Sequence, residues 1–280
     1  MLLTLFLKAP TPDYFSITQI HIQLNDPSLS SALLQELLKP KSAESAKDKE
    51  KRTLIAYQVG FDLAEGATQE YLLGVEKGVV GEEGEKENED VIITNLRKIL
   101  SGEKTIRLYL DFLFKHNKAD LLILKNTKDA LEARSSMYHS SVTFANAFMN
   151  AGTTSDQFLR QNLDWLGRAS NWSKFSATAA LGVIHKGNLS RGMTLLGPYL
   201  PGAAATSSPY SEGGSLFALG LINSGRGKEV LDYLKGQLGS HPGEEVVQHG
   251  AALGLGVAGM ASGNEGEYKE FNVARSLHCR

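Results

Sequence analysis

Hydrophobic residues recur at helical spacing along most of the chain, and the pattern is clearest near its beginning. Asp26 can accept hydrogen bonds from the free amides of a first helical turn, and Pro27 suits the first helical position. The leucines that follow share one face: Leu29, Leu33, Leu34, Leu37 and Leu38. Lys39–Pro40 stops that helix. Residues 1–77 as a whole are expected to form short helices of this kind.

Three further segments predict local structure with different degrees of ambiguity. The charged run Lys47–Arg52 fits either a solvated loop or the start of a helix. The apolar run Leu121–Leu124 could be a strand or a buried helix, and the helical patterns on both sides favour a helix. Thr154–Gln157 has the spacing of a capping box, with Gln157 placed to reach back to the cap amide. A helix lined by Phe158, Leu159, Leu163 and Leu166 is expected to follow.

The C-terminal half of the chain carries a repeated phrase. Phe175–Gly187 recurs as Gly213–Gly225 and again as His249–Gly263, so that the closing glycines follow one another at 38-residue intervals. A fainter copy, Phe144–Gly152, ends 35 residues before Gly187. Periods of this length are typical of stacked supersecondary units. Each unit is expected to turn at its closing glycine: Gly152, Gly187, Gly225 and Gly263.

Glycines also lie within the apolar phrases, where a helical glycine costs about 1 kcal/mol relative to alanine. Close approach of neighbouring helix backbones can offset that cost, because a missing side chain lets the backbones pack tightly. We therefore expect one such contact per repeat, at Gly182, Gly220 and Gly256. Replacing Gly220 with leucine is expected to destabilise the array by about 1–3 kcal/mol through overpacking.

The repeats predict an all-α fold. Each unit reads as an inner helix rich in Ala, Gly and Leu, followed by an outer amphipathic helix such as the one containing Leu189, Met193 and Leu196. No segment alternates with a period of two, so nothing predicts a sheet. The expected architecture is an armadillo-like α-solenoid that forms an open arc.

Five segments follow from these patterns. Residues 1–77 form the first helical part, and residues 78–90 form a linker, because Gly81–Asp90 contains no apolar residue and is expected to be disordered. Residues 91–135 are connecting helices, residues 136–271 are the repeats, and residues 272–280 depart from the repeat pattern. An acidic recruitment segment is the alternative to a plain linker.

Composition narrows the classes of partner. The 280 residues are 42% hydrophobic, with a net charge of −2 and a pI of about 6.4, so no basic field attracts nucleic acid or an anionic membrane. The single cysteine, Cys279, allows no internal disulfide and fits a reducing compartment. Met1–Leu7 is apolar but too short to span a bilayer. We expect a protein of the cytosol or the nucleus.

No catalytic constellation is apparent. Gly254–Gly259 matches the spacing of a dinucleotide fingerprint, but no βαβ unit can surround it, so repeat packing is the better interpretation. His185 and His249 lack any partner at metal-ligand spacing and are expected to be packed or partly exposed helix residues. Trp165 and Trp172 are expected to hold neighbouring helices together, with an exposed aromatic patch as the weaker alternative. We expect no cofactor, no metal and no enzymatic activity.

Several phrases resemble one family closely. The segments Val183–Gly187, Ala218–Gly225 and His249–Gly256 resemble proteasome/cyclosome repeats. Further segments resemble the family of the largest non-ATPase subunit of the 26S proteasome regulatory particle: Ile123–Asp129, Asn150–Arg160, Glu212–Gly220, Leu24–Pro27 and Ala56–Asp62. The resemblance covers about residues 1–271, and residues 1–77 resemble the end of the family's N-terminal helical rod.

The resemblance implies a scaffold without activity of its own. In that family the repeats close into an α-helical toroid in the base of the regulatory particle. The subunit contacts the ATPase subunits and other regulatory-particle subunits, supports ubiquitin receptors, and works in ubiquitin-dependent degradation.

The chain departs from the family's pattern in length, since the family continues on both sides. Residues 272–280 resemble a mispredicted exon or a truncated gene model, and three strong repeats are too few to close a ring. The alternatives are therefore a free helical-repeat adaptor for another protein, or a non-functional truncated fragment.

Overall fold

The computed structural model describes residues 6–7, 9–40, 45–80, 91–131, 135–203, 208–241 and 243–263. Across these residues every regular element is helical and there is no strand, so the prediction of an all-α protein is confirmed. None of the described helices is long and apolar enough to cross a membrane. The acidic segment at residues 81–90 and the segment at residues 264–280 lie outside the described residues.

The chain divides into two compact units, and the division falls within helix α7 (Glu103–Lys115), after Arg107. The first unit contains α2 (Tyr14–Leu24), α3 (Pro27–Leu38), α4 (Ala46–Gly66), α5 (Gln69–Val80) and α6 (Val91–Leu100). Helix α3 packs against α5, and α4 packs against both α2 and α6. The fully buried side chains of Ile17, Leu34, Leu63 and Leu96 join these helices in one core.

The beginning of α3 confirms the interpretation of Asp26–Pro27. The Asp26 carboxylate accepts a hydrogen bond from the backbone N–H of Ser28 at 3.0 Å, and Pro27 is the first helical residue. The helix ends at Leu38, one residue before the predicted stop. The charged run Lys47–Arg52 lies in the first turns of α4, which resolves that ambiguity in favour of a helix start.

Helix α6 belongs to the first unit although it follows the acidic segment. Leu96 and Leu100 are buried in the same core as the earlier helices, and α6 packs against α4 and α5. Gly78 lies inside α5, which continues to Val80. The predicted boundary at residues 78–90 therefore does not coincide with the division between the units. A stretch of sequence without apolar residues predicts a linker, but it does not predict which of the helices before and after it pack together.

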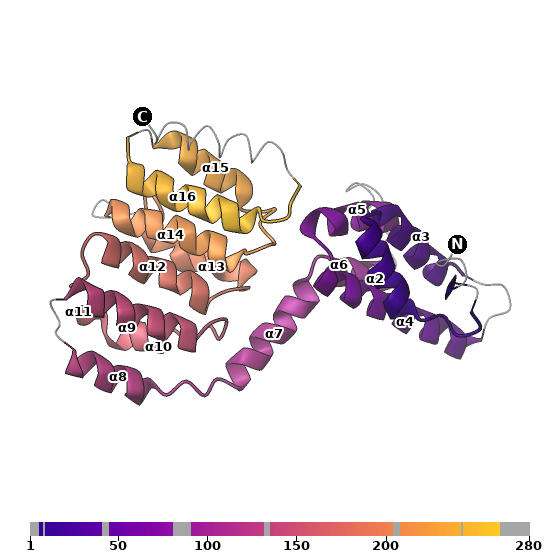
Figure 1. Ribbon diagram of the computed structural model, residues 1–280, viewed down its shortest axis with the longest axis horizontal. Helices are drawn as coiled ribbons and strands as arrows, with labels where there is room; N and C mark the ends of the chain where they lie inside the picture. The colour runs from indigo at the N-terminus through magenta and orange to yellow at the C-terminus, as the bar shows by residue number, and fades with distance from the viewer. Residues whose placement is uncertain are drawn as a thin grey trace. The chain divides into compact units, whose positions relative to one another are not determined.

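The second unit is a two-layered stack of helices. Its inner layer consists of α9 (Ser136–Met149), α12 (Trp172–Ile184), α14 (Pro209–Ile222) and α16 (Glu245–Ala258), and each packs against the next (Figure 1). The other layer contains α10 (Gln157–Gln161), α11 (Leu163–Leu166), α13 (Leu189–Leu196), η2 (Gly197–Tyr199) and α15 (Leu231–Ser240). Helix α8 (Leu121–Ala130) packs against α9 and α10, so Leu121–Leu124 is helical as predicted.

Two apolar clusters hold the layers of this stack together. One joins α8, α9, α10 and α12 through side chains such as Leu124, Phe158 and Ile184. The other joins the later helices through side chains such as Leu219 and Leu234. Burial between the two layers attaches each repeat to its neighbours, since no helix can bury its own apolar side chains alone.

The predicted capping box at Thr154–Gln157 is wrong. Asp156, not Thr154, directly precedes α10, and its side chain makes no capping hydrogen bond. Thr154 has a φ of +59°, and its N–H donates to the carbonyl of Ile184 at 3.0 Å. The expected single helix is also broken at Asn162, whose Nδ2 donates to the carbonyl of Phe158 at 2.7 Å. Asparagine side chains compete with the helix ladder in this way.

Candidate interaction interface

The closing glycines join each repeat to the next through a recurring backbone hydrogen bond. Gly152, Gly187, Gly225 and Gly263 have φ values of +67°, +83°, +66° and +68°. Three of these amides donate across the stack: Gly152 to Val183 at 3.0 Å, Gly187 to Ile222 at 2.9 Å, and Gly225 to Val257 at 3.3 Å. Each accepting carbonyl lies in the last turn of the next inner helix, where the helix's own ladder of hydrogen bonds ends.

This recurrence gives a physical reason for the period seen in the sequence. A positive φ is accessible to glycine without the steric cost that other residues meet. At each of these turns the glycine N–H faces the following repeat, so the spacing of the glycines matches the spacing of the repeats. The sequence predicted the positions of these turns, but it did not predict which carbonyls accept hydrogen bonds from their amides.

Two of the three glycines predicted to make close contacts, Gly182 and Gly220, lie where neighbouring helix backbones approach each other closely. A Cβ added at Gly182 would lie 2.6 Å from both Cα and O of Ala218 on the next inner helix. A Cβ added at Gly220 would lie 2.7 Å from the carbonyl carbon of Gly254. Both positions are fully packed against backbone, which no rotamer change can move aside.

Gly256 does not make the close contact expected of it. It is exposed, and a Cβ added there would meet no atom within 4 Å. Gly254 is instead one of the glycines of α16 that approach α14 closely, and a Cβ added there would lie 2.5 Å from the carbonyl oxygen of Leu216. The two residues differ by two positions, which is about 200° around a helix, so they lie on opposite faces.

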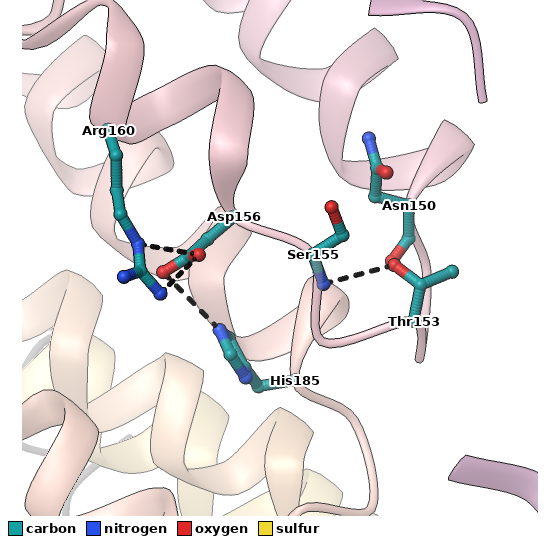
Figure 2. A network of polar contacts seen from close by, with 6 residues as sticks. All are labelled: Asn150, Thr153, Ser155, Asp156, Arg160 and His185. Atoms are coloured by element: carbon teal, nitrogen blue, oxygen red, sulfur yellow. Dashed lines mark hydrogen bonds and ion pairs between the residues drawn. The ribbon is translucent and has the colours of Figure 1, made fainter. Parts of the chain in front are cut away.

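A polar network joins the start of α10 to the end of α12 (Figure 2). The Asp156 carboxylate accepts from Nε of Arg160 at 2.8 Å, and Nη2 of Arg160 lies 2.6 Å from the same oxygen. Nε2 of His185 faces the other carboxylate oxygen at 3.8 Å, which is beyond hydrogen-bond range. Burial lowers the pKa of His185; Asp156 opposes that shift and Arg160 adds to it. The neutral imidazole is favoured, and it packs between two neighbouring repeats of the second unit.

This network contains the residue types of a nucleophilic triad but not its geometry. The Ser155 hydroxyl points away from the imidazole of His185 (Figure 2). Within the described residues, neither ring nitrogen of His185 has a hydrogen-bond partner. The Ser155 amide instead donates to the Thr153 hydroxyl at 3.2 Å, which stabilises the turn before α10. The Ser155 hydroxyl and the His185 imidazole therefore lack the contact between nucleophile and base that a triad uses.

The aromatic residues contact one another across the inner layer. The indole of Trp165 stacks on the buried His139 ring, with 4.0 Å between ring centroids. Trp172 is 51% exposed, yet its ring edge contacts Tyr210 on α14 and His249 on α16. Both tryptophans thus connect neighbouring helices, and His249 is an exposed helix residue. The segment Gly254–Gly259 lies within and directly after α16, not at a turn between strand and helix.

Comparison with known proteins matches these features to one family. Residues 1–117 match the model of the N-terminal domain of 26S proteasome subunit RPN2. Over 98% of its length the chain is 46% identical to the 26S proteasome regulatory subunit rpn2 of Schizosaccharomyces pombe. It is 40% identical over 96% of its length to the 26S proteasome non-ATPase regulatory subunit 1 homolog A of Arabidopsis thaliana.

The chain belongs to the RPN2 family of 26S proteasome regulatory subunits. A third relative, the 26S proteasome non-ATPase regulatory subunit 1 of Drosophila melanogaster, is 39% identical over 97% of the chain. The chain spans 29%, 30% and 31% of the length of these three relatives. The match to the RPN2 N-terminal domain covers residues 1–107 of the first compact unit and all of α7, while the repeats lie beyond it.

Proposed function

We propose that this chain acts as a non-catalytic scaffold in the base of the proteasome regulatory particle. In that role it supports assembly of the ATPase ring and so contributes to ubiquitin-dependent degradation in the cytoplasm and nucleus. Its partners are the ATPase subunits and other regulatory-particle subunits. The names of the relatives support the regulatory-particle context, since two of them are called non-ATPase regulatory subunits.

The single observation that carries the scaffold role is the backbone-level packing of the inner helices. Contacts between helices usually pass through side chains, which can change rotamer when a neighbour moves. Here the backbones of neighbouring inner helices contact each other at Gly182 and Gly220. The amides of the closing glycines also donate hydrogen bonds to the next repeat. Tightly packed interiors transmit displacement and resist compression. A stack built this way holds its surface features at fixed spacing, which is what a scaffold requires.

Exposed apolar side chains supply surface for partners. On α9, Met137, Phe144 and Phe148 are 66%, 46% and 71% exposed. Large apolar groups gathered on one helix are typical of protein–protein contact sites. They suit a chain that works inside a larger assembly.

The test is affinity purification of the tagged chain from its own cells in the presence of ATP, followed by mass spectrometry. Recovery of regulatory-particle ATPases together with non-ATPase subunits is the expected result. Two variants give a matched comparison: Gly220→Ala disturbs the inner stack, whereas Gly256→Ala alters an exposed glycine of the same layer. Recovery of the particle should fall for Gly220→Ala only.

Two other outcomes would overturn the proposal. Recovery of chaperones alone would identify an orphaned fragment with an exposed repeat face. Recovery of a different partner in stoichiometric amount would identify a free helical-repeat adaptor. Equal recovery by the two glycine variants would contradict the argument that inner-layer packing carries the scaffold role.

A further inference from the structure

An open cleft of the second unit lies beside the interrupted helix of the first repeat. The cleft has a volume of about 480 Å³ and lies among α10, α11, α12 and α13. Its apolar walls include Leu163, Leu181 and Leu195, and Tyr199 lies at one side. Leu163 is 64% exposed, so this wall is open to solvent. The volume lies in the range of clefts that take small ligands or a few side chains.

The cleft lies beside an interrupted helix of the first repeat. In the later repeats the corresponding positions are occupied by the continuous helices α13 and α15. In the first repeat Asn162 separates α10 from α11, and Nζ of Lys128 donates to Asn162 Oδ1 at 2.8 Å. The side chain at the break therefore has partners on both α8 and α10, which fixes the interrupted geometry. The hollow is a built feature of this repeat.

The charged side chains that line the cleft do not balance, since two are positive and one is negative. Asp156 is neutralised by Arg160, whose guanidinium lies 2.6 Å from the carboxylate. Lys174, in the first turn of α12, also lines the cleft. Its ammonium makes no ion pair or hydrogen bond with any other described residue, so one positive charge is left over. An apolar hollow with an uncompensated ammonium group complements an aliphatic side chain next to a carboxylate.

We propose that this cleft docks a linear peptide segment of another protein, in which aliphatic residues are flanked by Asp or Glu. The inference rests on the proposed function, because a scaffold subunit meets protein partners and not free metabolites. The aliphatic side chains of the segment pack between Leu163 and Leu195, and its carboxylate pairs with Lys174. The cleft thereby adds one defined recognition site to the otherwise structural repeat stack.

The experiment is selection of a displayed library of random peptides on the purified 280-residue chain. Recovered peptides should carry an acidic residue beside aliphatic ones. Their affinity, measured by fluorescence anisotropy with synthetic labelled copies, should fall about tenfold or more in Lys174→Glu, the loss expected when one charge-assisted hydrogen bond is removed. Leu163→Glu should weaken binding as well, and added salt should reduce it.

Lys125→Glu is the matched control, because Lys125 is an exposed helical lysine outside the cleft. It should bind the peptides as the unaltered chain does. Lys174→Glu places a negative charge in the first turn of α12, which the helix dipole tolerates, and thermal melting checks that the fold is retained. Lys174→Met provides a second variant that keeps the length of the side chain but removes its charge.

The proposal is overturned if no peptide is enriched, or if enriched peptides bind Lys174→Glu and Leu163→Glu as well as they bind the unaltered chain. Self-association of the chain that is abolished by Lys174→Glu would assign the cleft to a second copy instead, and would also overturn it. These failures differ from failure of the scaffold role. If the chain still recovers the regulatory particle, only the cleft proposal is lost.

Discussion

Replacing Gly220 with alanine tests the close packing of the inner helices with the smallest possible change. The added Cβ would lie 2.7 Å from the carbonyl carbon of Gly254, whereas carbon atoms pack best at about 3.5–4.0 Å. Helices α14 and α16 must therefore separate locally by about 1 Å. Because both surfaces are backbone, we place the overpacking cost near the upper end of its usual range, about 3 kcal/mol. Alanine regains about 1 kcal/mol of helix propensity, so the expected net loss is about 2 kcal/mol.

Gly256→Ala is the matched control for this prediction. It makes the same chemical change in an inner helix, but the new methyl group meets no atom within 4 Å. Only the helix-propensity gain of about 1 kcal/mol remains, so this variant should be more stable than the unaltered chain. The difference between the two variants isolates the packing cost, about 3 kcal/mol, because the propensity gain cancels.

Tryptophan fluorescence provides the assay. Both tryptophans, Trp165 and Trp172, lie in the second unit, so their emission during urea or thermal unfolding reports on the repeat stack alone. For a unit of this size a change of 1 kcal/mol shifts Tm by about 2–4 °C. Gly220→Ala should lower Tm by about 4–8 °C, and Gly256→Ala should raise it by about 2–4 °C. Equal stabilisation by both substitutions would refute the close-packing argument.

Three further predictions concern the turns, the buried histidines and the first unit. Gly225 has a φ of +66° with open space around it, so Gly225→Ala should cost about 1–2 kcal/mol in urea unfolding and Gly225→Asn less. Burial lowers the pKa of three histidines: His21, His139 and His185. Below about pH 6.5 the unfolded chain therefore binds more protons than the folded chain. The free energy of unfolding should be constant above about pH 6.5 and should fall as the pH drops below it. The urea midpoint across that range checks the sign, and a midpoint that rises on acidification would contradict it. Tyr71→Phe removes two hydrogen bonds of a buried hydroxyl and should destabilise the first unit by about 1 kcal/mol, seen by circular dichroism but not by tryptophan fluorescence. A shift of the tryptophan transition in that variant would show that the two units do not unfold separately.

The fold class and the position of the turns followed from the sequence because they depend on local chemistry. The start of α3 at Asp26–Pro27 needs only a capping carboxylate and a fixed proline φ, and both act within one turn. The closing glycines were visible because a positive φ restricts the choice of residue. Helical periodicity likewise reports burial of one face, whichever neighbour covers it.

The features that the sequence did not predict depend on contacts between residues far apart in the chain. Thr154–Gln157 has the spacing of a capping box, but the Thr154 amide bonds to Ile184 on another helix, and that competing partner lies 30 residues away in sequence. Nothing in residues 78–90 shows that α6 returns to the core of the first unit. The sequence does not tell which of Gly254 and Gly256 contacts the neighbouring helix, since both are glycines of the same helix. Only the rotation of α16 against α14 distinguishes them.

The sequence by itself therefore determined that the chain is helical, repetitive and turned at regularly spaced glycines, because each of these properties depends on residues near one another in the chain. Only the tertiary structure decided which glycines contact a neighbouring helix, which carbonyls the turn amides reach, and that a cleft lined by Lys174 lies beside the interrupted helix. Those features depend on the relative rotation and spacing of helices. Packing over long sequence separations determines that geometry, and no local pattern records it.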